Sequence, residues 1–278
     1  MSEPLITRNA LLNKLATSER YPSVPSVAIP FINMANDETT SFGKLSDVIE
    51  TDPVLAARIL TVANSGLYGF RREIKSITHA LVMLGWNAIK MIALGSLILA
   101  RMSDDDRILF DHSTRVAQIA RFIAIEANLY KIEEFAVVGM LHDFGISILK
   151  TLYPNEHAEA AKLSIENAVP LHLAEREVLG VDHAMVGGWT LQAWNLPETI
   201  TESVARHHTY DPDDYHARKT AVIHVADVFA CATDYLGPTY EMVPEVSPEA
   251  LEVMGFTNAE LKDLLIAVMK MEFEPIVM

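Results

Sequence analysis

The residues best suited to chemistry in this sequence begin with a histidine beside an aspartate. His142 and Asp143 interrupt the apolar run from Val137 to Ile146, whose helix we expect to be largely buried. A buried, ionised carboxylate is costly unless something compensates its charge. A divalent metal is one such compensation, because imidazole nitrogen and carboxylate oxygen are both good ligands. A hydrogen-bonded His–Asp pair in the core is the alternative, and the dipeptide by itself favours that alternative.

A second aspartate poses the same problem elsewhere in the chain. Asp227 lies inside the equally apolar segment 221–230, so contact with water is not expected. Taken singly, a histidine near such helices is more often a surface or core residue than a ligand. Together, five histidines and two aspartates on separate apolar helices suit a bundle that points ligands inward. The candidate metal ligands are His112, His142, Asp143, His183, His207, His208 and Asp227.

Mixed imidazole and carboxylate ligation suits iron, manganese or zinc, and the sequence does not choose among them. The remaining reactive residues carry weaker signals. His224 is interpreted as a packed core histidine, with an outer neighbour of the site as the alternative. Cys231, the only cysteine, is expected to be buried and inert. Solvated side chains are expected for four histidines in polar or helix-edge surroundings: His79, His157, His172 and His216.

The elements that must position these residues are helices. Apolar residues recur at three- and four-residue spacing over 45–99, 108–148 and 171–232, and no convincing strand pair appears. Asp52-Pro53 is typical of a helix start, and Asn64-Ser65-Gly66 of a helix end. The run Ser103–Asp106 separates two long apolar patterns. We therefore predict an all-α, two-part helical bundle, with an N-terminal subdomain over 1–105 packed on a C-terminal domain over 106–278 that carries the metal site.

Composition narrows the classes of function. Half of the 278 residues are hydrophobic, and one cysteine excludes an internal disulfide. No signal peptide is visible, and the longest uninterrupted apolar segment, 91–100, is about half of a membrane span. We therefore expect a cytoplasmic protein with no membrane partner. The net charge of −15 disfavours direct nucleic-acid binding, although a metal or a local basic pocket would still admit a small anion.

Short motifs recur through most of the chain. In the first half they are Pro22-Ser23-Val24-Pro25, Asp52-Pro53-Val54-Leu55, Ala63-Asn64-Ser65 and Leu84-Gly85. In the second half they are His112-Ser113, Leu141–Gly145, His183-Ala184, Trp194–Pro197, His207-His208 and Asp227. The combined pattern resembles the HDOD domain, a relative of the HD and HD-GYP phosphohydrolases of bacterial signalling proteins. The resemblance implies that the seven candidate residues ligate one or two ions. It also implies that Asp143, the candidate catalytic residue, bridges two metals beside a nucleophilic water.

The sequence also departs from active HD-GYP enzymes. Three residues after the motif aspartate, where those enzymes usually carry lysine, this chain has Ile146. The loop Thr209–Tyr215 is acidic and lacks the Gly-Tyr-Pro signature, and Ile108 stands where some sites have an extra acidic ligand. These departures argue against a third metal and against hydrolysis of cyclic-di-GMP.

Two functions compete at this point. The first is a non-catalytic or weakly catalytic regulatory module that holds a divalent metal and signals to a protein partner. The second is a metal-dependent phosphohydrolase acting on a phosphorylated small molecule. The missing lysine and an N-terminal half without chemistry favour the first. A plain adaptor with an empty site would leave two buried aspartates unexplained.

Overall fold

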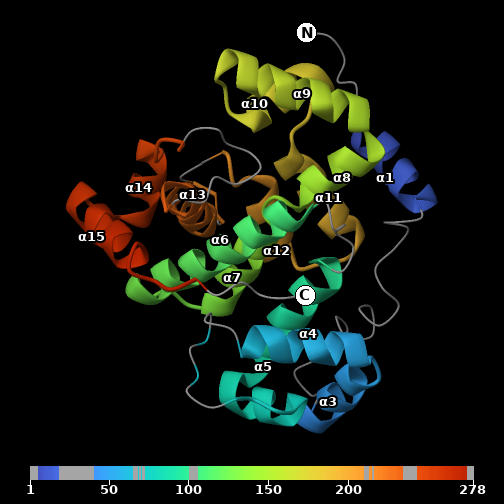
Figure 1. Ribbon diagram of the computed structural model, residues 1–278, viewed down its shortest axis with the longest axis vertical. Helices are drawn as coiled ribbons and strands as arrows, with labels where there is room; N and C mark the ends of the chain where they lie inside the picture. The colour runs from blue at the N-terminus through green and yellow to red at the C-terminus, as the bar shows by residue number, and fades with distance from the viewer. Residues whose placement is uncertain are drawn as a thin grey trace. The chain divides into compact units, whose positions relative to one another are not determined.

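Every regular element formed by the described residues is an α-helix, which confirms the predicted all-α fold class (Figure 1). The computed structural model describes residues 6–18, 41–64, 68, 70, 73–99, 106–209, 213–214, 216–233 and 243–273. Of the predicted boundary run Ser103–Asp106, the first three residues lie outside the described residues, as does the motif Pro22–Pro25. The helices divide into two units, and each unit is described by itself.

The smaller unit contains α3 (Phe42–Glu50), α4 (Pro53–Ala63) and α5 (Ile77–Leu99). The predicted start of α4 is confirmed, because Oδ1 of Asp52 accepts a hydrogen bond of 3.0 Å from the backbone N–H of Leu55. Asn64 follows α4 and holds both backbone groups of Ile74, at 2.7 Å to its N–H and 2.8 Å to its carbonyl. α5 is kinked at Gly85, whose φ of 82° suits glycine. No candidate ligand lies in this unit.

The larger unit carries every candidate ligand. Its first helix, α1 (Arg8–Thr17), packs on α11, and the backbone N–H of Ile6 donates to the carbonyl of Leu179 at 3.1 Å. The predicted N-terminal segment 1–105 thus contains a helix, α1, that packs with the helices of the C-terminal segment. Its contacts join residues that are far apart in the sequence. The other helices are α6 (Arg107–Glu126), α7 (Ile132–Leu141), α8 (Phe144–Leu152), α9 (Pro154–Asn167), α10 (Leu171–Leu179), α11 (His183–Ala193), α12 (Glu198–Ala205), α13 (Ala217–Ala232), α14 (Pro248–Met254) and α15 (Asn258–Val268).

The most apolar stretch of the larger unit is interrupted at the His142-Asp143 pair. α7 ends at Leu141 and α8 begins at Phe144, so the two polar residues occupy the break between helices. Among the described residues, Ile132–Leu152 is the one stretch long and apolar enough to cross a membrane, and 83% of its most apolar window is buried inside the protein. Such burial is typical of core helices, and the cytoplasmic location stays a prediction.

Two glycines bring α8 and α11 into backbone contact beside this break. A Cβ atom at Gly145 would lie 1.9 Å from the carbonyl oxygen of His183 and 2.8 Å from the backbone nitrogen of Gly187. The backbones of α8 and α11 are therefore closely packed at Gly187. Because α11 begins at His183, this contact sets the distance between His183 and the residue before α8, Asp143.

Replacing Gly145 with alanine should separate α8 from α11. We expect Gly145→Ala to lower the free energy of unfolding by about 1–3 kcal/mol or more, because the new methyl group meets rigid backbone atoms. The matched control is Gly43→Ala in α3, where an added Cβ meets nothing within 4 Å, and no loss is expected there. Urea unfolding followed by circular dichroism compares the two. Equal stability of both variants would contradict the close approach.

Candidate metal centre

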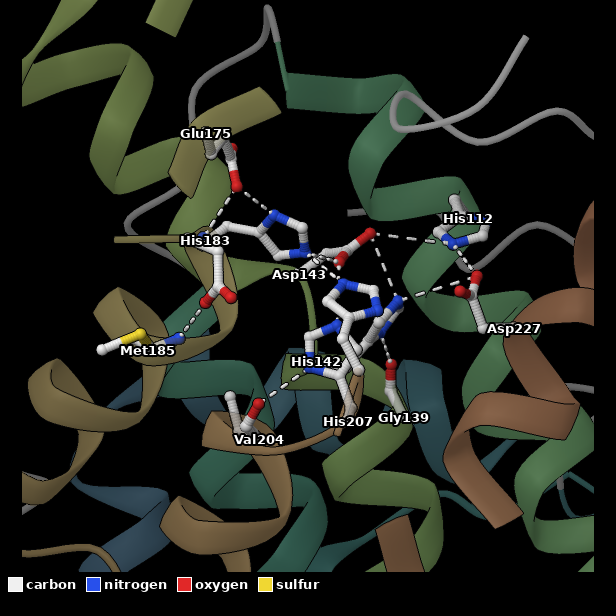
Figure 2. Close-up of polar contacts among 12 residues, drawn as sticks. His112, Gly139, His142, Asp143, Glu175, His183, Met185, Val204, His207 and Asp227 are labelled. Atoms are coloured by element: carbon white, nitrogen blue, oxygen red, sulfur yellow. Dashed lines mark hydrogen bonds and ion pairs between the residues drawn. The ribbon is translucent and has the colours of Figure 1, made fainter. Parts of the chain in front are cut away.

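Five structural elements bring the seven candidate ligands together. Figure 2 shows His112, His142, His183, His207 and Asp227 around the carboxylate of Asp143. His112 comes from α6, His142 and Asp143 from the α7–α8 break, and Asp227 from α13. His183 is the first residue of α11, and His207 and His208 follow α12. Six of these side chains are at most 3% exposed, and His208 is half-buried. The sequence therefore identified residues that do converge in the structure.

The two oxygens of Asp143 face two different groups of imidazoles. Oδ2 lies 3.2 Å from Nε2 of His142 and 3.8 Å from Nε2 of His112. Oδ1 lies 3.2 Å from Nε2 of His183 and 3.6 Å from Nε2 of His207. The carboxylate thus stands between the groups, in the position of a ligand shared by two ions.

Each group has one further candidate ligand. Beside His112 and His142, Oδ1 of Asp227 lies 2.9 Å and 3.9 Å from their Nε2 atoms, respectively. Beside His183 and His207, Nε2 of His208 lies 2.9 Å from Nε2 of His183. We call the set His112, His142 and Asp227 the first group, and the set His183, His207 and His208 the second group. Ligand atoms of His183, His207 and His208 all lie within 4.8 Å of one another.

Hydrogen bonds on the outer side of the rings turn their inner nitrogens toward Asp143. Nδ1 of His142 bonds to the carbonyl of Gly139 at 2.7 Å, and Nδ1 of His207 to the carbonyl of Val204 at 2.8 Å. A carbonyl only accepts, so each Nδ1 carries a proton and each ring turns its Nε2 inward. Nε2 of His142 and Oδ2 of Asp143 are buried and form no hydrogen bond with the described residues. A buried imidazole nitrogen and a carboxylate oxygen 3.2 Å apart need a proton or a metal ion between them, and this set of donors fits a metal.

The charge state of the buried carboxylates supports the same fit. Burial by itself would raise the pKa of Asp143, but His142, His183 and His207 hold it well below its usual range. Burial would also raise the pKa of Asp227, but His112 and His142 lower this pKa below its usual value. Burial lowers the pKa of His183, and the carboxylates of Glu175 and Asp143 raise it well above the ordinary value. Two ionised aspartates thus meet basic nitrogens in the interior, where a divalent cation would replace the protons.

A glutamate outside the predicted set orients His183. Oε2 of Glu175 accepts hydrogen bonds from Nδ1 of His183 at 2.6 Å and from its backbone N–H at 2.8 Å. Glu175 is fully buried, and although burial raises its pKa, His183 and His157 lower it to about 2. Sequence reasoning missed this residue. The signal was its position in α10, where Leu171, Ala174, Glu175 and Leu179 share the buried face.

Two histidines expected to be solvated lie next to the centre instead. His157 is 7% exposed, and its Nδ1 lies 3.5 Å from Oε1 of Glu175. His172 is half-buried and stacks on the ring of His208 at 4.0 Å. Burial is the main cause that lowers the pKa of His172 to about 4. Both expectations were wrong because α9 and α10 pack against the ligand-bearing helices, which local sequence does not reveal.

The remaining histidines behave more nearly as expected. His79 is exposed and His216 is half-buried at the start of α13. His224 is half-buried, and its Nε2 accepts a hydrogen bond of 3.0 Å from the backbone N–H of Ser247. Burial is the main cause that lowers the pKa of His224 to about 4, so this ring is neutral and supports α14.

The structure describes both isoleucines at which the sequence departs from active HD-GYP enzymes, and part of the acidic loop. Ile146 packs in an apolar cluster with Leu109 and Leu171 and is 1% exposed, so this position offers the centre no cation. Ile108 is 60% exposed on α6. Of the acidic loop after His208, Tyr210–Pro212 and Tyr215 lie outside the described residues.

Comparisons with known proteins identify the family of the chain. The family model of the HDOD domain matches residues 21–210. An uncharacterized protein of Treponema pallidum (strain Nichols) is 24% identical over 213 residues, which are 73% of this chain and 42% of that relative. The chain therefore spans less than half of the length of this relative.

Solved structures share the fold. An HDOD domain protein with unknown function from Geobacter sulfurreducens is 25% identical, with a TM-score of 0.72 over 95% of this chain and 98% of that chain. A "putative phosphohydrolase" from Shewanella amazonensis SB2B is 21% identical, with a TM-score of 0.74 over 94% of each chain. At this identity the second likeness shows the fold alone.

Removing the charge of Glu175 should weaken metal binding without removing a ligand. We expect Glu175→Gln to lower the affinity for a divalent ion by roughly 10–100-fold, because His183 loses the partner that fixes its ring and raises its basicity. Competition titration against a chromogenic chelator measures this affinity. Glu177→Gln, an exposed position on the same helix, is the matched control. Unchanged affinity in Glu175→Gln would show that this contact does not support the centre.

Proposed function

Because this chain belongs to the HDOD domain family, we propose that it is a regulatory module that holds a divalent metal centre and passes the state of that centre to a signalling partner protein. The observation that supports this proposal is the position of the Asp143 carboxylate, whose two oxygens face two groups of inward-turned imidazoles. The first group and Oδ2 of Asp143 would hold one ion, and the second group and Oδ1 would hold another. When bound, such ions supply Lewis acidity and lower the pKa of a coordinated water.

The chain's own residues explain how metal occupancy can be sensed. The ligands come from α6, the α7–α8 break, α11, the turn after α12, and α13, so one centre ties five elements together. Without a cation, Asp143 and Asp227 depend on protons shared with the histidines around them. A ligand that binds only the folded arrangement stabilises it in proportion to its concentration. Metal loading should therefore tighten the packing of these helices and change the surface that a partner meets.

Three features favour regulation over catalysis. The position three residues after Asp143 is filled by Ile146, which is buried among apolar side chains and cannot neutralise a phosphate oxygen. The candidate ligands of the first group are at most 3% exposed, whereas a substrate phosphate must reach an open coordination position. The overall charge of −15 also opposes the approach of an anionic substrate.

A metal-dependent phosphohydrolase is the second candidate, and one specific observation favours it. A carboxylate shared between two ligand groups is the arrangement that two-metal hydrolases use to activate water. Two solved structures from Shewanella amazonensis SB2B with this fold carry phosphohydrolase names. On this alternative, Asp143 would be the catalytic residue and the substrate would be a phosphorylated small molecule.

Metal removal tests the proposed centre directly. Protein purified without chelators is expected to contain one or two divalent ions per chain by elemental analysis. Metal at a hundred times its Kd should stabilise the chelated protein by about 2.7 kcal/mol. Asp143→Asn should abolish this gain, because it removes the shared charge, whereas the exposed Asp263→Asn should retain it. Absence of bound metal, with wild-type stability indifferent to added Fe²⁺, Mn²⁺ or Zn²⁺, would overturn the proposal.

The same preparations separate regulation from catalysis. Metal-loaded wild type is expected to hydrolyse no member of a panel of phosphomonoesters, nucleotides and cyclic dinucleotides above the Asp143→Asn background, as measured by phosphate release and by chromatography of the nucleotide products. Turnover that is present in wild type and Asp263→Asn but lost in Asp143→Asn would establish the phosphohydrolase instead.

A further inference from the structure

The cysteine of this chain lies beside the first group of candidate ligands. Asp227 and Cys231 are four residues apart on α13, so their side chains share one face of the helix. Sγ of Cys231 lies 3.9 Å from Oδ1 of Asp227. Ligand atoms of His112, Asp227 and Cys231 all lie within 4.8 Å of one another, and Cys231 is 2% exposed. The thiol therefore belongs to the interior of the centre and not to a separate part of the core.

The spacing of these atoms suits ligands of one ion. At ordinary zinc bond lengths, a thiolate sulfur and a carboxylate oxygen on one tetrahedral ion stand about 3.6 Å apart. The observed 3.9 Å is close to that separation. A second observation points to the same place: Nε2 of His142, 3.9 Å from Oδ1 of Asp227, is buried and forms no hydrogen bond with the described residues. His112, Asp227 and Cys231 thus lie close enough together to be ligands of one ion.

We infer that Cys231 is a thiolate ligand of the metal held by the first group. This inference rests on the proposed metal centre and adds the identity of one ligand. The competing interpretation is that the thiol only donates a weak hydrogen bond to Asp227. The two differ in whether sulfur bonds to the metal.

A sulfur ligand would make the two halves of the centre chemically different. The second group and Asp143 offer only imidazole nitrogen and carboxylate oxygen, which accept manganese or iron readily. The first group with Cys231 offers a soft donor as well, which favours zinc, iron or cobalt over magnesium and manganese. The position held by the first group should then discriminate among metals more strongly than the position held by the second group.

Cobalt substitution tests this ligand in the full chain. The chelated, reduced protein is loaded with Co²⁺ without oxygen, and its absorption spectrum is compared with those of Cys231→Ser and Cys231→Ala. Wild type is expected to show visible cobalt bands together with an intense near-ultraviolet thiolate-to-cobalt band. Both variants should keep visible bands and helical circular dichroism but lose the near-ultraviolet band. Their preference for Zn²⁺ over Mn²⁺ should fall by roughly tenfold or more.

The outcomes separate the inference from the proposed function. Visible cobalt bands without the thiolate band in wild type would overturn the ligand role of Cys231 and leave the metal centre standing. No cobalt binding at all would overturn the metal centre, and the ligand role with it. If either variant fails to fold, the wild-type spectrum still decides, because the chain contains one cysteine.

Discussion

The structure of the larger unit depends on the burial of two ionised carboxylates. Asp143 and Asp227 lie in the core with exposures of 2% and 3%, in surroundings where an uncompensated charge would cost several kcal/mol. Imidazole nitrogens of four histidines lie 2.9–3.9 Å from their oxygens. Backbone carbonyls fix two histidine rings with Nε2 turned inward, and Glu175 holds a third. Satisfying these charges explains why five histidines converge on one point.

Backbone packing fixes the position at which the histidines and the carboxylates meet. The contact of Gly145 with His183 and Gly187 draws α11 against the start of α8, and so sets His183 beside Asp143. The break between α7 and α8 lets two adjacent residues, His142 and Asp143, both reach the centre from a stretch that is otherwise buried. The apolar environment then strengthens each electrostatic contact inside it. The fold and the site depend on each other, because the helices that bury the two carboxylates also supply the histidines that contact them.

Much of the arrangement could be predicted from the sequence. Helical spacing gave the fold class, and polar residues inside apolar helices identified the seven side chains that converge. Contacts between distant segments could not be predicted in this way. Glu175 and His157 lie on α10 and α9, and their approach to His183 follows from helix packing. Tertiary contacts likewise determine where α1 lies and which side chains surround Cys231. The four-residue step from Asp227 to Cys231 was visible in the sequence.

We propose that metal ions, and not shared protons, compensate the Asp143 carboxylate. Crystals of protein purified without chelators, with diffraction recorded at the absorption edge of the metal found in them, test it most directly. We expect one or two anomalous peaks, each within bonding distance of an Asp143 oxygen and of the Nε2 atoms of one histidine group. A map with no such peak, in which Nε2 of His142 instead donates a hydrogen bond to Asp143, would contradict it.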